Sequence, residues 1–99
     1  MSARRVPRER PTVTVQIPPV EVQVLDAKVT IAEVRGYTSF AGERRYIVSC
    51  FVEWGGYRSP LFQLDVKDND ELEQKLKVEI AKMKLAIHSG FTLPFQRVA

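Results

Sequence analysis

The fold is decided by residues 44–66, which read RRYIVSCFVEWGGYRSPLFQLDV. β-Branched and aromatic residues dominate the runs on both sides of Gly55-Gly56, which is typical of two adjacent strands. A Gly-Gly pair suits a two-residue hairpin turn, because both central positions can adopt a positive φ without steric cost. Pro60 has no N–H group, so it places the second strand at a sheet edge or delays its pairing until Leu61. The hairpin predicts three facing pairs, namely Trp54 with Tyr57, Glu53 with Arg58, and Ile47 with Leu64.

Two or three further strands are predicted before this hairpin. Residues 12–17 alternate between apolar and polar side chains, and Pro18-Pro19 then breaks the pattern because neither residue can donate to a β-ladder. Alternation resumes in residues 20–24 and again at residues 29–31, with a bend expected between them at Asp26. The segment from Gly36 to Glu43 has a glycine near each end and is predicted to be a loop.

One helix is predicted over about residues 69–88. Asp68 and Glu71 have the spacing of a capping box, and Gly90 is a stop signal just beyond the last turn. The apolar stripe of this helix recurs every three or four residues and consists of Leu72, Leu76, Ile80, Met83 and Ile87. The alternation of Phe91, Leu93 and Phe95 then predicts a tail that docks as an extended segment.

These elements predict a single α+β domain over residues 12–99. An antiparallel sheet of about four to five strands packs against one C-terminal helix. The 99 residues are enough for one hydrophobic core. Their longest apolar runs are far too short to cross a bilayer, so no membrane partner is expected. The single cysteine cannot form an internal disulfide, which favours a cytoplasmic setting.

The basic residues of the N-terminal arm, residues 1–11, account for the net charge of the chain. Residues 1–10 contain Arg4, Arg5, Arg8 and Arg10 against Glu9, which gives a net charge of +3. Basic and acidic residues cancel over residues 11–99, so the whole formal charge of +3 lies in the arm. The arm has too little apolar surface to offset its ordering entropy, and we expect it to be flexible.

Residues suited to catalysis or metal binding are few. Cys50 lies in the middle of a strand with no histidine nearby in sequence, which favours a buried and unreactive thiol. His88 lies in the last helical turn, where it interacts favourably with the helix dipole when charged. The acidic residues around Asp68 lack the glycine and ligand spacing of a calcium loop. We therefore expect no catalytic site, no metal, no cofactor and no small-molecule substrate, and we do not expect an enzyme.

Cations and aromatic rings are mixed in and around the strand of residues 44–54. This is the chemistry that binds single-stranded nucleic acid, in which bases stack on rings and cations follow the phosphates. We therefore predict a small nucleic-acid-binding protein; the sequence leaves open DNA or RNA, and single or double strands. The predicted interface consists of Arg4, Arg5, Arg8, Arg10, Arg35, Tyr37, Arg44, Arg45, Tyr46, Trp54, Tyr57 and Arg58.

Both faces of the strand of residues 44–54 are largely apolar, whereas a single helix can cover only one of them. The second face must meet the N-terminal strands, a ligand or another subunit, and a large apolar patch is seldom left open on a monomer. We therefore expect a homo-oligomer, with a dimer favoured. The alternative function is a protein-interaction or assembly module that self-associates through its sheet and has no nucleic-acid role.

Overall fold

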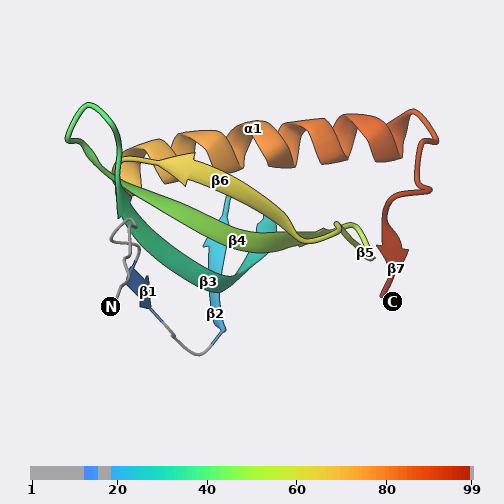
Figure 1. The fold of residues 1–99 in the computed structure, drawn as a ribbon. Coiled ribbons are helices and arrows are strands. Elements are labelled where there is room, and N and C mark those ends of the chain that lie inside the picture. Colours follow the sequence, from blue (N-terminus) through green and yellow to red (C-terminus); the bar gives the residue numbers. More distant parts are fainter. Residues whose placement is uncertain (1–12, 16–18, 99) are drawn as a thin grey trace, which may run out of the picture.

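The fold consists of an antiparallel sheet and one C-terminal helix. A computed structural model describes residues 13–15 and 19–98 of the chain. Strand β3 (Ala27–Thr38) and strand β4 (Arg44–Trp54) form the long antiparallel pair at the middle of the sheet. Helix α1 (Asn69–His88) runs across one face of this pair (Figure 1). The predicted class, an antiparallel sheet packed against one C-terminal helix, is confirmed.

The short strands flank the central pair in tandem. Strands β1 (Val13–Val15) and β2 (Val20–Val24) pair with successive parts of β3, and β5 (Tyr57–Arg58) and β6 (Phe62–Val66) pair with successive parts of β4. A last strand, β7 (Gln96–Arg97), pairs with β5. The described part of the sheet is therefore four strands wide, with β7 added beside the hairpin tip.

The hairpin register shifts by one residue after β5. Trp54 faces Tyr57 and Glu53 faces Arg58, as predicted, but the expected pairing of Ile47 with Leu64 is wrong. Ile47 faces Asp65, because Pro60 cannot donate to the ladder and the chain leaves β4 between β5 and β6. Since side chains alternate with period two, this shift turns the apolar residues of β6 toward the helix.

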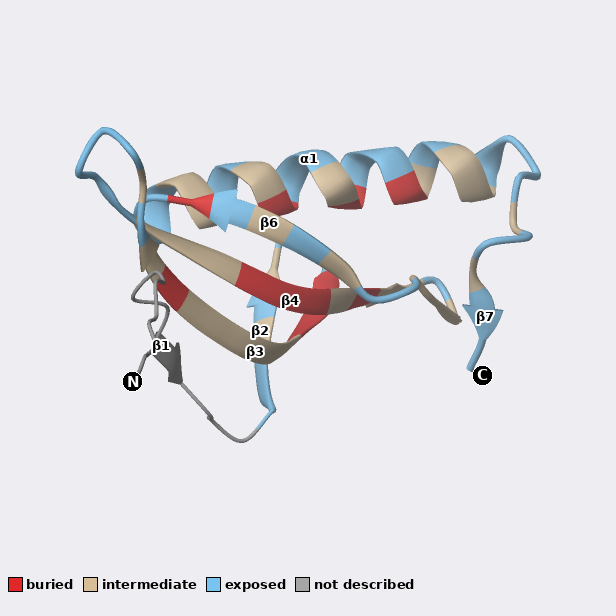
Figure 2. Cartoon of the chain, viewed as in Figure 1, coloured by how far each residue is buried: buried red, intermediate tan, exposed pale blue. Residues whose placement is uncertain are grey.

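The hydrophobic core lies between α1 and the central strands (Figure 2). The helix supplies Leu76, Ile80 and Met83, which lie at i, i+4 and i+7 and are at most 3% exposed. The sheet contributes one side chain from every second position, because alternate residues point to the same face. The buried sheet residues of this core are Ala27, Val29, Val48, Cys50, Val52 and Val66.

The helix begins and ends where its capping residues predict. The Asp68 carboxylate accepts a hydrogen bond from the Glu71 backbone N–H at 2.9 Å, and the Glu71 carboxylate accepts one from the Lys67 backbone N–H at 2.7 Å. Gly90 has a φ of 86°, which suits the residue that reverses the chain after the last turn. These contacts satisfy backbone groups that a helix terminus otherwise leaves unpaired.

Two segments differ from the sequence prediction. Gly36 is not in a loop: β3 continues to Thr38, Gly36 is paired with Tyr46 of β4, and the end of the Arg44 side chain lies over Gly36. Only Gln96–Arg97 of the tail after α1 dock as an extended segment, in β7, and the predicted alternation of residues 91–95 is not extended. Phe91 and Leu93 are exposed and only Phe95 packs on the core, because a turn closes from Thr92 to Phe95.

Leu25 provides a test of backbone strain in the turn between β2 and β3. Its φ is 57°, in a region where a Cβ atom costs about 1–2 kcal/mol, and its side chain is 60% exposed. We expect Leu25→Gly to raise the free energy of unfolding by about 0.5–1 kcal/mol in urea denaturation. Leu25→Ala keeps the Cβ and is expected to give no such gain. Equal behaviour of the two variants would contradict a strained turn.

Candidate nucleic-acid interface

The predicted interface residues that the structure describes form two groups at opposite ends of β4. The first group lies where β3 ends and β4 begins, and the second lies at the Gly55-Gly56 tip. Trp54 lies ten positions after Arg44, which is about 33 Å of extended strand. The structure therefore does not gather these residues into one surface. The first group consists of Arg35, Tyr37, Arg44, Arg45 and Tyr46, and the second of Trp54, Tyr57 and Arg58.

Trp54 makes contacts within the chain. Its indole N–H donates to the Asp26 carboxylate at 3.1 Å, and its ring centroid lies 5.7 Å from that of His88. Lys84 lies 5.4 Å above the same ring and donates to Asp26. The Trp54 ring thus connects the β2–β3 turn to the last turns of α1. Part of its surface is therefore occupied by contacts within the protein.

Arg58 and Tyr57 also have partners within the protein. Two guanidinium nitrogens of Arg58 donate to the Glu53 carboxylate at 3.0 and 2.8 Å. Arg58 also lies 5.1 Å over the Phe51 ring, and Arg97 lies 5.3 Å over the Tyr57 ring. The cations of the tip group are therefore matched by a carboxylate or by a ring of the same molecule.

Arg45 is held by carboxylates at the other end of β4. Its guanidinium contacts Asp65 at 2.8 Å, Glu43 at 3.2 Å and Glu71 at 3.7 Å. The Tyr37 hydroxyl donates to Asp65 as well, and this bond and the Arg45 contact hold the pKa of that carboxyl below its usual range. Asp65 was not among the predicted residues, because its position beside Arg45 depends on the register shift at Pro60. The charge of Arg45 is consequently balanced by carboxylates of the same protein.

Arg44 has a different environment from Arg45, although the two are adjacent in sequence. Side chains alternate along β4, so Arg44 shares the helix-side face with Tyr46 and lies 5.8 Å over its ring. The Arg44 side chain is exposed and passes over Gly36. Among residues 13–15 and 19–98, no carboxylate lies within ion-pair distance of Arg44. We call Arg35, Tyr37, Arg44 and Tyr46 the Arg44 corner.

Arg35 completes the Arg44 corner on the opposite face of β3. Its Nε lies 3.8 Å from a Glu33 carboxylate oxygen, which is a long contact for an ion pair. That nitrogen is buried and makes no hydrogen bond within the described part of the chain. Arg35 is therefore less strongly neutralised than Arg45 or Arg58.

Val13, the first described residue after the basic arm, pairs with β3 at the Arg44 corner. Backbone pairing sets Val13 opposite Gly36 and Thr14 opposite Arg35. Arg4, Arg5, Arg8 and Arg10 lie outside the described residues, but the chain that carries them joins the sheet at Val13. The register of β1 thus attaches the arm beside Tyr37 and Arg44, and not beside the Gly55-Gly56 tip.

The sheet face away from α1 has no large exposed apolar patch among the described residues. Ile47 and Phe51 are half-buried on this face, and the cations there are paired with acids. Lys28 contacts Glu53 at 3.1 Å and Glu21 at 3.7 Å. This face therefore combines little apolar exposure with balanced charge, and its four basic residues, Lys28, Arg35, Arg45 and Arg58, are matched by Glu21, Glu33, Glu53 and Asp65.

Cys50 and His88 occupy separate positions in the fold. Cys50 is fully buried in the core, and burial raises the pKa of its thiol to about 11. His88 lies against Trp54 at the end of the helix, with the two rings tilted by 37°. Among residues 13–15 and 19–98, no three His, Cys, Asp or Glu side chains are placed to hold a metal ion. The same part of the chain contains no helix able to span a membrane.

Comparisons with protein-family models, with curated proteins and with solved structures gave no match for this chain.

The carboxylate of Asp65 predicts a pH-dependent stability. Its pKa is lowered in the folded state, so its contribution is present above the unfolded pKa, about 3.9, and is lost as the pH falls through the lower folded value. We expect Asp65→Asn to lower the free energy of unfolding at pH 7, and the difference from wild type to shrink progressively as the pH falls below about 4. Urea denaturation at a series of pH values measures this. A difference that persists unchanged at pH 2 would mean that Asp65 acts through packing instead of charge.

Proposed function

We propose that this protein binds nucleic acid through the basic arm and the Arg44 corner. The observation that carries the proposal is the register of β1, which joins the arm to the sheet beside Arg35, Tyr37, Arg44 and Tyr46. The arm supplies a local charge of +3 on an otherwise neutral chain. Phosphate contacts give nucleic-acid binding most of its affinity, and exposed rings provide stacking for unpaired bases.

Arg44 is the residue of the corner best suited to a phosphate. An exposed guanidinium without a carboxylate partner among the described residues can form the paired hydrogen bonds that phosphate oxygens accept. Arg45 would first have to leave Asp65, Glu43 and Glu71, which makes it a weaker candidate. Tyr46 lies beneath Arg44 on the helix-side face, so a ring and a cation occur together there, whereas Tyr37 lies on the other face of the same sheet end.

The tip group contributes less to this proposal. Trp54, Tyr57 and Arg58 lie about 33 Å of strand away and have partners in the fold. A single strand of several nucleotides could reach both ends of β4, so stacking on Trp54 stays a prediction of the sequence. We also infer a cytoplasmic setting, which the buried and unpaired thiol of Cys50 supports.

The arm should set the salt dependence of binding. On single strands, each neutralised phosphate contributes about −0.7 to the slope of log K against log salt concentration. We expect deletion of residues 1–10, which removes four arginines, to weaken binding and to reduce the magnitude of that slope by about 2–3. Fluorescence anisotropy with labelled single-stranded and duplex oligonucleotides measures both quantities. An unchanged slope would show that the arm makes no phosphate contacts.

Arg44 and Arg58 form a matched pair that locates the site. Both lie over an aromatic ring, at 5.8 and 5.1 Å, but they stand at opposite ends of the β4 hairpin. We expect Arg44→Gln to weaken oligonucleotide binding by about tenfold and Arg58→Gln by less than about twofold. Circular dichroism checks that both variants fold. A larger loss for Arg58→Gln would move the interface to the tip group and restore Trp54 as the stacking platform.

Self-association is the second candidate function, and one observation favours it. Large apolar side chains are exposed on the outer side of α1 and in the segment after it, where Val78 is 53%, Leu85 69% and Leu93 98% exposed. Exposed apolar groups of this kind mark interfaces when they gather. The proposed contact surface is thus the helix, whereas the sequence placed it on the sheet.

Sedimentation equilibrium tests this second candidate with two matched variants. We expect the wild-type chain to form a dimer at high concentration, Leu85→Glu to return it to the 11.3 kDa monomer, and Ile47→Glu to leave the dimer intact. A monomeric wild-type protein would exclude the assembly function. A dimer that only Ile47→Glu disrupts would place the contact on the sheet.

A further inference from the structure

The break in the edge strand leaves a cavity between α1 and the sheet. β5 ends at Arg58 and β6 begins at Phe62, so no ladder residue covers Val52 between them. Ser59 satisfies the backbone of Val52 in place of a strand: its N–H donates to the Val52 carbonyl at 2.8 Å and its Oγ accepts from the Val52 N–H at 2.9 Å. The backbone of Val52 is therefore hydrogen-bonded. The space beside Val52 that side chains of a continuous edge strand would fill is left open.

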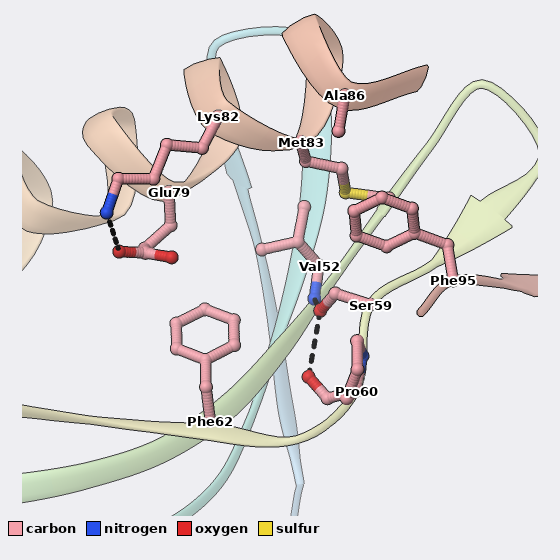
Figure 3. A pocket seen from close by; sticks show the side chains of 9 residues that line it. All are labelled: Val52, Ser59, Pro60, Phe62, Glu79, Lys82, Met83, Ala86 and Phe95. Carbon is pink, nitrogen blue, oxygen red and sulfur yellow. Dashed lines mark hydrogen bonds and ion pairs between the residues drawn. The ribbon is translucent and has the colours of Figure 1, made fainter. Parts of the chain in front are cut away.

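The cavity has apolar walls and a volume of about 260 Å³ (Figure 3). Val52 lines it from the sheet and Met83 from the helix, and both are nearly fully buried. Phe62 lines it from β6, and Phe95 from the segment that returns after α1. An apolar cavity of about 150 Å³ suffices to bind benzene, so this one has room for a single ring with a short substituent.

Glu79 gives the cavity one anionic group. Its carboxylate is 32% exposed and contacts the Lys82 Nζ through one oxygen at 3.4 Å. In Figure 3 the other oxygen turns toward the space between Phe62 and Val52. Lys82 also lines the cavity, but its side chain is 69% exposed, so its ion pair with Glu79 is weak and readily replaced. The Ser59 hydroxyl already donates to the Pro60 carbonyl at 3.0 Å, which leaves Glu79 as the group that can receive a charged ligand.

We propose that this cavity binds a small organic cation, namely an ammonium group carried on a compact aromatic or aliphatic body. The apolar body enters between Phe62, Phe95 and Met83, and the ammonium donates to Glu79 at the rim. Aromatic rings attract cations, and methionine sulfur makes favourable contacts with aromatic groups, so the walls and the carboxylate favour the same ligand. The site lies on the β6 side of α1, and the inference does not rest on nucleic-acid binding.

The two methionines of the chain allow a direct test. Met83 lines the cavity and Met1 lies outside the described residues, so a protein labelled with ¹³C at the methionine methyl groups carries a reporter and an internal reference. We expect benzylamine at neutral pH to shift the Met83 resonance saturably, with a dissociation constant on the order of 1 mM, and to leave Met1 unchanged. Benzyl alcohol and benzoate have the same ring without the positive charge, and both are expected to bind at least about fivefold more weakly.

Two pairs of variants separate charge from shape. Glu79→Gln should weaken benzylamine binding by about tenfold, whereas Glu73→Gln, which removes the same charge from the comparable Glu73–Lys77 pair, should not. Ala86→Leu should fill the cavity and weaken all three probes, while Lys82→Ala should leave benzylamine binding unchanged or stronger. The proposal is overturned if Met83 does not respond to benzylamine up to about 20 mM. It is also overturned if benzyl alcohol binds equally well, or if Lys82→Ala abolishes binding.

Discussion

The width of a single helix is the constraint from which most of this structure follows. An α-helix with its side chains is about 10–12 Å across, whereas four strands spaced about 4.8 Å apart span roughly 15–19 Å. α1 therefore buries the middle of the sheet, β3 and β4, and leaves both flanks partly open. Cavities of about 310 and 200 Å³ lie between α1 and the β2–β3 side, and one of about 260 Å³ lies on the β6 side.

The charges of the molecule follow a second rule: most cations on the sheet face away from α1 are neutralised by acids from neighbouring strands. Arg45 with Asp65, Arg58 with Glu53 and Lys28 with Glu53 all join different strands or elements. Such exposed pairs contribute little stability individually, but they leave the sheet face electrically balanced. Arg44 has no such partner among the described residues, and the arginines of residues 1–10 account for the net charge of the chain.

Sequence reasoning was accurate where the signal is local. The Gly55-Gly56 turn fixes the first two facing pairs of the hairpin, and Asp68 with Glu71 fixes the start of the helix. It failed where the outcome depends on a distant partner. The sequence Ser59-Pro60-Leu61 does not determine how many residues between β5 and β6 are left unpaired with β4. A register shift of one residue decides whether Leu64 faces the core or solvent. Gly36 was mistaken for a loop residue because the side chain that crosses it, Arg44, comes from the next strand.

The candidate site shows the same limit. Alternation along β4 places Arg44 and Arg45 on opposite faces of the sheet, but the residues that each arginine contacts depend on how β4 pairs with β6 and β3.

The burial of Cys50 beneath α1 limits the chemistry of its thiol. With 0% exposure and a pKa near 11, the single thiol can react with an aqueous reagent only when the helix moves away from the sheet. The rate at which a thiol reagent labels Cys50 therefore reports how often the contact between α1 and the sheet opens. No cysteine has to be engineered into the protein for this measurement.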